Sequence, residues 1–203
     1  MIGLILKDFL NLKRHSKIYF ILVIFYFILG ITNKDFSMFG SMIAMMAVIL
    51  PVTSMAYDEK NNWDRYALTM PISRRDLVLS RYILSFIFLV LAFIISMLLN
   101  LIFGSSSFIE SVLINSGILL FGIIIMSAIF PVLFKYGVEK GRLFMMIILF
   151  APTAVIMLLS RLGFTLPDKE AAKVLLYFLP VIAVAASAVS VLISVSIYRK
   201  KEF

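Results

Sequence analysis

The sequence contains no cysteine and a single histidine among its 203 residues. Without cysteine there is no disulfide framework and no thiolate metal site, and one histidine is too few for a histidine-based metal centre. Charge is also scarce, because 15% of the residues are charged where a soluble domain typically has about 25%. The chain therefore has too little polar surface for an ordinary soluble domain, and its composition equally excludes a disordered or collagen-like chain.

Apolar residues are abundant instead: they make up 63% of the chain, and the mean hydropathy is +1.08. A helix that crosses about 30 Å of hydrocarbon needs about 20 mostly apolar residues. The sequence predicts an all-α integral membrane protein with six such helices, at Ile18–Ile31, Phe36–Tyr57, Leu77–Phe103, Phe108–Phe134, Leu143–Ser160 and Val174–Tyr198.

The net charge is +8, and the basic residues that produce it lie between the apolar blocks, mostly in the segments on one side of the membrane. Fifteen of the 19 basic residues flank the spans on one side, and the other four are Lys34, Arg161, Lys169 and Lys173. Basic residues concentrate in cytoplasmic loops. We therefore expect a multi-pass protein of the cell membrane with both termini in the cytoplasm, and the charge does not indicate a nucleic-acid partner.

Residues 1–16 form the first recognisable unit, an amphipathic helix. The apolar residues of one face are Ile2, Ile5, Leu6, Phe9, Leu10 and Leu12. Leu4 is the one apolar exception on the polar face. Such a helix lies in the membrane interface. It is either a simple anchor or an elbow helix that also contacts a cytoplasmic partner. The six-span domain follows at residues 17–203, with a cytoplasmic loop at 58–76 and an external loop at 161–173.

The cytoplasmic loop predicts a short helix. Trp63, Tyr66, Ala67 and Met70 have helical spacing, which indicates an apolar stripe. Asp58 and Glu59 precede it and are expected at its start, where the helix dipole favours acidic residues.

The end of this loop has its own signals. Pro71 is expected to stop the short helix. Ser73 and Asp76 have the spacing of a capping box for the next span. Trp63 is the only tryptophan in the sequence. It is either an aromatic anchor in the headgroup layer or a contact for another protein.

Taken together, this layout resembles a type-2 ABC transporter permease, the membrane subunit of type V (ABCG-like) exporters. The specific resemblance lies in the segment 58–75, DEKNNWDRYALTMPISRR, and in the opening segment 4–9, LILKDF. Both are similar to the small Gram-positive members, such as the phenol-soluble-modulin exporter permeases.

The resemblance implies a division of labour. Two permease chains, expected as a homodimer, would form the path, and two cytoplasmic ATPase subunits would bind ATP and Mg. This chain would hold no cofactor of its own. The loop at Lys135–Arg142 would be a second ATPase contact, and the expected coupling residues are Asp58, Glu59, Trp63, Arg65, Tyr66 and Met70.

In such permeases the second and fifth spans face the substrate. Both are rich in methionine here, and methionine forms adaptable apolar surfaces. The alternative is that these methionines are packing filler or lipid contacts. The candidate pathway residues are Met42, Met45, Met46, Ile49, Met145, Leu149 and Pro152.

No enzymatic motif accompanies this architecture. The sequence has no phosphate-binding loop, and apart from Glu110 the spans have almost no ionisable residue at membrane depth. Hence the chain is not expected to be an enzyme, and its energy would come from the partner ATPase.

We expect it to export an amphiphilic substrate, most readily a hydrophobic or amphipathic (antimicrobial or cytolytic) peptide, across a membrane whose lipids surround the spans. Two alternatives remain. One is the six-span capture subunit of a vitamin importer, and the other is a non-transporting membrane assembly factor.

Overall fold

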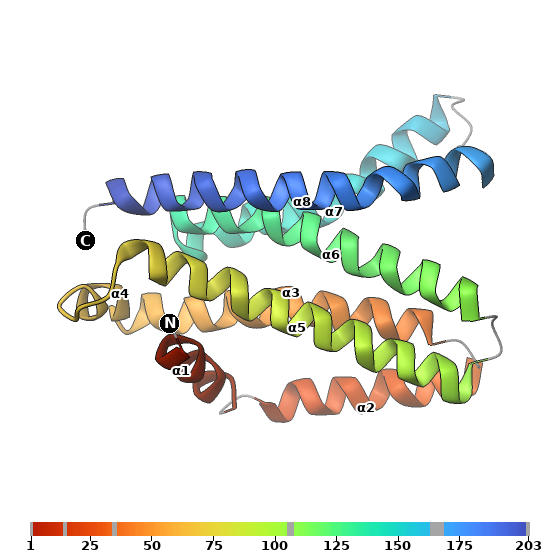
Figure 1. Cartoon of the computed structure of the whole chain (residues 1–203), viewed down its shortest axis with the longest axis horizontal. Coiled ribbons are helices and arrows are strands. Elements are labelled where there is room, and N and C mark those ends of the chain that lie inside the picture. Colours follow the sequence, from red (N-terminus) through yellow and green to blue (C-terminus); the bar gives the residue numbers. More distant parts are fainter. Residues whose placement is uncertain (1, 14–15, 34–35, 105–107, 163–168, 202–203) are drawn as a thin grey trace.

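The computed structural model describes residues 2–13, 16–33, 36–104, 108–162 and 169–201. Within these residues all regular structure is helical, as predicted (Figure 1). The helices are α1 (Ile2–Lys13), α2 (Ser16–Asn33), α3 (Ser37–Lys60), α4 (Trp63–Ala67), α5 (Arg74–Phe103), α6 (Phe108–Tyr136), α7 (Val138–Arg161) and α8 (Lys169–Lys200).

The long helices are those predicted to span the membrane. By length and composition α3, α5, α6, α7 and α8 each qualify, and α1 with α2 adds a sixth if this bent pair is counted as one. The axes of α1 and α2 differ by 75°. Figure 1 shows α2 running alongside the bundle with α1 turned away from its direction, as an elbow helix requires.

Helix boundaries differ most from the predicted spans at the starts of the last two, each of which begins five residues earlier than predicted. α8 begins at Lys169, so the final part of the predicted external loop is helical. Residues 163–168 of that loop lie outside the described residues. The other spans gain fewer residues at an end, because polar side chains continue a helix into the headgroup layer.

The core lies where α6 packs between α8, α5 and α3. Phe130 of α6 is fully buried and meets the ring of Tyr82 edge-on at 4.8 Å. The Tyr82 hydroxyl hydrogen-bonds Ser190 (2.6 Å) and Ser194 (2.8 Å). Ser190 and Ser194 of the last span therefore serve close packing within the chain.

A second polar contact joins α5 and α6 in mid-bundle. The Ser96 hydroxyl donates to the Asn115 side-chain oxygen at 2.5 Å, and both residues are buried. Gly40 of α3 packs against this pair, where a Cβ atom would collide with the Ser96 hydroxyl. Asn115 thus bridges helices, as a polar residue inside a span is expected to do.

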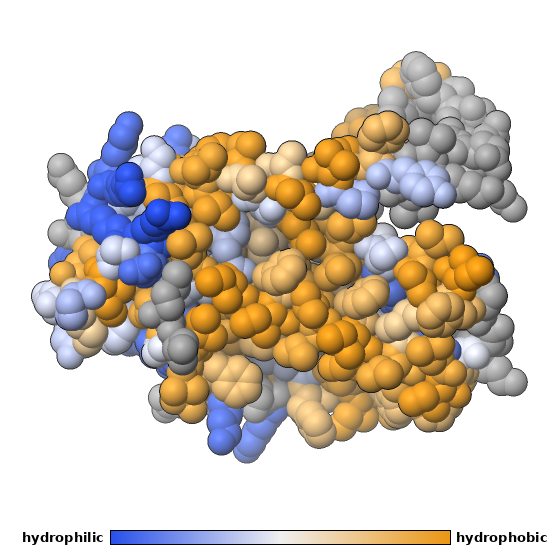
Figure 2. Space-filling view, in the orientation of Figure 1, coloured by the Kyte–Doolittle hydropathy of each residue, from blue (hydrophilic) through white to orange (hydrophobic). Residues whose placement is uncertain are grey.

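The surface confirms the membrane class. Hydrophobic side chains cover the middle of the molecule, and hydrophilic ones gather at one end, over the C-terminal part of α8 (Figure 2). We call this the basic end; it comprises α4, the last turn of α8 and the first turn of α7. Exposed apolar side chains on a band of this kind are in contact with lipid rather than water.

Candidate functional site

At the basic end, the chain leaves α3 through a tight turn into α4. The prediction for Asp58 and Glu59 is wrong, because they lie in the last turn of α3 rather than at the start of the short helix. Asn62 has a φ of 51°, a left-handed conformation that asparagine tolerates, and α4 begins after it. Ser73 does cap α5 as predicted, since its hydroxyl accepts from the Asp76 amide at 3.1 Å.

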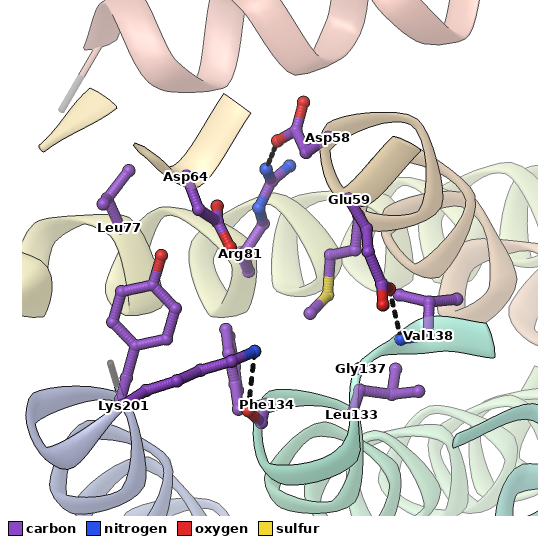
Figure 3. Close-up of a pocket in the computed structure, with 12 residues that line it drawn as sticks. Asp58, Glu59, Asp64, Leu77, Arg81, Leu133, Phe134, Gly137, Val138 and Lys201 are labelled. Atoms are coloured by element: carbon purple, nitrogen blue, oxygen red, sulfur yellow. Dashed lines mark hydrogen bonds and ion pairs between the residues drawn. The ribbon is translucent and has the colours of Figure 1, made fainter. Parts of the chain in front are cut away.

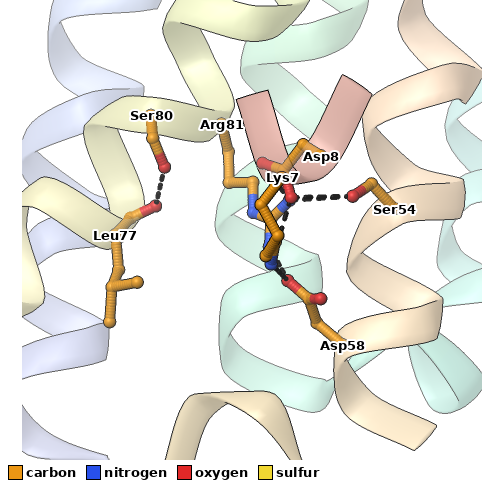
Figure 4. A network of polar contacts seen from close by, with 7 residues as sticks. All are labelled: Lys7, Asp8, Ser54, Asp58, Leu77, Ser80 and Arg81. Carbon is orange, nitrogen blue, oxygen red and sulfur yellow. Dashed lines mark hydrogen bonds and ion pairs between the residues drawn. The ribbon is translucent and has the colours of Figure 1, made fainter. Parts of the chain in front are cut away.

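Beneath this turn lies a buried ion cluster, which joins three helices (Figure 4). From α1 come Lys7 and Asp8, from α3 come Ser54 and Asp58, and from α5 comes Arg81. The Arg81 guanidinium contacts both carboxylates, that of Asp8 at 2.5 Å and that of Asp58. The Lys7 ammonium lies 2.6 Å from the Asp58 carboxylate, and the Ser54 hydroxyl donates to Asp8 at 3.0 Å.

The cluster is charge-balanced. Burial and the nearby Arg81 guanidinium lower the pKa of Lys7 to about 8, so Lys7 is mostly protonated at pH 7. Two cations then face two carboxylates. Asp8 is 1% exposed and Asp58 5%, so neither charge is solvated by water if its partner is lost. This arrangement holds α1, α3 and α5 in one fixed relation.

Trp63 is packed onto this cluster. The Lys7 ammonium lies 4.3 Å from the centre of the Trp63 ring, within cation–π distance. The Trp63 indole nitrogen is buried and has no hydrogen-bond partner among the described residues. By contrast, Tyr66 of α4 is 58% exposed and Arg65 is also exposed. The tryptophan thus anchors α4 to the bundle, and Tyr66 is the aromatic that a partner can reach.

A small polar cavity of about 50 Å³ lies beside the cluster (Figure 3). Asp58, Asp64, Arg81 and Lys201 contribute charge to its walls. Burial raises the pKa of Asp64. The Lys201 ammonium donates to the Phe134 carbonyl at 3.4 Å, which ties the end of α8 to α6. A cavity of this volume holds a few water molecules and no larger ligand.

Glu59 points toward the start of α7. Its carboxylate accepts from the Val138 amide at 2.5 Å, where the first turn of a helix leaves amides unpaired. Gly137, between α6 and α7, has a φ of 80°, and a Cβ atom there would collide with the Glu59 carboxylate. The end of α3 and the start of α7 are therefore joined by one side chain.

Above this contact a groove runs between α3, α6 and α7. A cavity of about 340 Å³ in it is lined mainly by apolar side chains. Five predicted pathway residues line it, and Met46 and Pro152 do not; those lining it are Met42, Met45, Ile49, Met145 and Leu149. The structure thus brings together most of this set from two separate spans.

The groove continues toward the basic end as a second cavity of about 480 Å³, which shares Ile49 and Met145 with the first. Its walls there carry both signs of charge, and the charged residues are Glu59, Lys60, Glu139 and Arg142. One surface therefore changes from charged to apolar along the length of α3 and α7.

A family model described as "ABC-2 family transporter protein" matches residues 3–199. The chain belongs to the ABC-2 transporter family. It is thus an ABC-2 permease, a multi-pass membrane component that works with a separate ATPase subunit and is not itself the ATPase. Comparison with curated proteins and with solved structures gives no match.

In this permease the predicted coupling residues do not form one surface. Asp58 belongs to the ion cluster, and Glu59 caps α7. Trp63 is packed inward, and Met70 is half-buried after the end of α4. Arg65 and Tyr66 are exposed on α4. The coupling role of the set stays a prediction, and these last two are its accessible members. Among the described residues no group of acidic and histidine side chains is arranged to hold a metal ion.

The sequence interpretation missed the ion cluster. In the sequence, Lys7 and Asp8 belong to the polar face of the N-terminal amphipathic helix, and Arg81 is one of the fifteen basic residues on one side of the spans. One signal was present: Arg81 lies inside the predicted span Leu77–Phe103, where an isolated cation needs a partner. The partner was not evident, because Asp8 is 73 positions away in the chain.

Replacing Gly137 by alanine is expected to lower the free energy of unfolding by about 1–2 kcal/mol, since a left-handed φ disfavours any Cβ atom and the Glu59 carboxylate must move. Thermal unfolding of the purified protein in detergent measures this. Gly3→Ala is the matched control: Gly3 is helical and has open space around its Cβ position. An equal loss in the control would contradict the interpretation.

Proposed function

We propose that this ABC-2 permease is an exporter subunit that moves amphiphilic substrates, most readily hydrophobic or amphipathic peptides, out of the cell. The observation that carries the proposal is the groove between α3 and α7, which is charged at the basic end and apolar beyond it. An amphipathic peptide presents the same two surfaces. Methionine side chains along the apolar part adapt to many shapes, which suits substrates that share amphipathicity rather than a sequence.

The basic end is assigned to the cytoplasm, because basic residues concentrate there. The ATPase would then bind at α4 and at the first turn of α7, with Tyr66 and Arg65 as exposed contacts. Closure of the ATPase pair would be transmitted through Trp63 to the ion cluster, and through Glu59 to α7. Both routes end on helices that line the groove.

A second copy of the chain is proposed to complete the path. Large apolar side chains of α7 are exposed along its length, among them Ile147 and Phe150. The groove is also open at this helix, since α3 and α6 form its other walls. Two chains with α3 and α7 facing each other would enclose the substrate between them, with two ATPase subunits below. The resemblance to the small Gram-positive exporter permeases supports the same assembly.

The proposal is tested with inverted membrane vesicles from cells that express the tagged chain together with its ATPase. We expect ATP-dependent uptake of a fluorescent 20-residue amphipathic helical peptide, and an ABC ATPase that co-purifies with the chain and is stimulated by this peptide. A hydrophilic peptide of equal length and charge is the control. Equal uptake of both peptides, or uptake in right-side-out vesicles only, would contradict export of amphiphiles.

Met145→Trp should slow peptide uptake about tenfold, equivalent to ~1.4 kcal/mol of added barrier, because the indole would fill the groove where its two cavities meet. Retention of the ATPase should not change. Met146→Trp is the matched control on the same helix, since Met146 does not line the groove. The pathway assignment is wrong if both variants transport at the wild-type rate.

A further inference from the structure

A separate groove of about 480 Å³ lies at the basic end, on the side of α8 where it meets the start of α5. Three cations lie at its charged margin: Arg75 from α5, and Arg199 and Lys200 from the last turn of α8. Its other wall is apolar and comes from Val191, Leu192 and Val195, which lie one to two turns deeper along α8. Neither the ion cluster nor the proposed substrate groove uses these residues.

The groove is held by fixed contacts on both sides. The Arg74 guanidinium donates to the carbonyls of Arg199 at 2.6 Å and Lys201 at 3.0 Å, which joins the start of α5 to the end of α8. Two turns deeper, the Tyr82 hydroxyl bonds Ser194 of α8. The spacing between the cations and the apolar wall is therefore set by the fold rather than by mobile side chains alone.

Within the described part of the chain, the positive charge of the groove is compensated only in part. Arg75, Arg199 and Lys200 are exposed, and none forms an ion pair with a described carboxylate. The nearest acidic neighbour in sequence is Asp76, whose carboxylate interacts with Ser73 and with Arg75, so that one carboxylate stands beside three cations. Leu192, on the apolar wall, is 71% exposed. Positive charge beside exposed apolar surface is complementary to a ligand that has both a negative group and a hydrocarbon chain.

We infer that this groove binds an anionic phospholipid of the surrounding membrane. Its phosphate would lie against the three cations, and an acyl chain would run along Val191, Leu192 and Val195. The position fits, because the charged end of a spanning helix lies in the headgroup layer and the apolar residues before it lie in the hydrocarbon. Basic pockets at helix ends are suited to anionic headgroups, each cation adding attraction near the surface. The inference does not depend on the substrate or the direction of transport.

The test uses the full chain purified in detergent and incubated with an equimolar mixture of phosphatidylglycerol and phosphatidylcholine, with bound lipid counted by native mass spectrometry. We expect a preference for phosphatidylglycerol of at least about tenfold, because each cation in the headgroup layer adds attraction to an anionic lipid. The triple variant Arg75→Gln, Arg199→Gln, Lys200→Gln should lose most of this preference. These side chains are exposed, so its thermal midpoint should match the wild type.

The matched control is Lys60→Gln, Lys135→Gln, Lys140→Gln, which removes the same charge from exposed positions at the same end of the molecule. It should keep the preference. Equal loss in both triple variants would overturn the site, since general charge would then explain the binding. Displacement of the lipid by millimolar glycerol 1-phosphate would also overturn it, because a free phosphate site would not need the apolar wall. No preference in the wild type would do the same.

Discussion

Replacing Arg81 by methionine is expected to lower the free energy of unfolding by about 3–5 kcal/mol, the usual cost of removing one member of a buried charge network. The carboxylates of Asp8 and Asp58 would remain buried, and among the described residues Lys7 would be the one cation left beside them. For a chain of this size the thermal midpoint should fall by about 10 °C. Thermal unfolding in detergent measures this, with the loss of monodispersity as a second readout.

Arg65→Met is the matched control for that variant, because Arg65 is exposed on α4 and forms no ion pair among the described residues. It should change the midpoint by little. The double variant Arg81→Met, Asp58→Leu leaves Lys7 paired with Asp8 and should recover much of the stability, because no buried carboxylate then lacks a cation. If Arg81→Met behaves like Arg65→Met, the cluster does not hold the three helices together.

The double variant also separates stability from coupling. It would keep α1, α3 and α5 packed. Lys7 would still lie over the Trp63 ring, but it would no longer form an ion pair with Asp58 of α3. Under the proposed function, ATP hydrolysis should then proceed with reduced peptide uptake. Normal uptake in this variant would mean that the ATPase movement reaches the groove by another route, such as Glu59 and α7.

Tyr66→Ala is expected to reduce peptide transport at least about tenfold, because a buried interface aromatic is typically worth 2 kcal/mol or more to a complex. The side chain is exposed in the isolated chain, and among the described residues its ring meets that of Trp63 at a tilt, with 5.5 Å between ring centres. Folding should therefore be unaffected. The measurements are co-purification of the ATPase and peptide-stimulated ATP hydrolysis.

Tyr177→Ala is the control for Tyr66, since Tyr177 is also an exposed tyrosine and lies in the first part of α8, far in sequence from α4. It should transport normally. Trp63→Ala makes an informative third variant: it should lose stability as well as transport, because the indole is half-buried against Lys7. Full ATPase retention in Tyr66→Ala would remove this residue from the proposed interface.

Much of the fold was predictable because lipid imposes a simple rule. A segment in hydrocarbon must satisfy its own backbone, so apolar runs of sufficient length become helices with few alternatives. Local signals were also reliable where both partners are close in sequence: Ser73 caps α5 through Asp76, three residues on. The prediction for Asp58 and Glu59 failed for a related reason. A helix that leaves the hydrocarbon can continue through polar residues, and the apolar pattern does not say how far.

The candidate site was predictable only in part. Methionine spacing on α3 and α7 indicated an adaptable surface, and five of the predicted residues do line one cavity. Trp63 stood out by its rarity, but its direction did not follow from the sequence, because a short helix can present either face to the bundle. The inward position depends on Lys7, which is 56 positions earlier in the chain.

The sequence by itself determined the membrane class, the spans and the gathering of basic residues at one end, since these depend on local composition in a solvent of fixed thickness. Only the tertiary structure decided which charges pair. Asp8, Asp58 and Arg81 come from three helices, and burying any one of these charges is unfavourable unless it is paired with the opposite charge of the others. Long-range ion pairs of this kind form when the helices pack together, and the residue pattern along a single helix does not predict them.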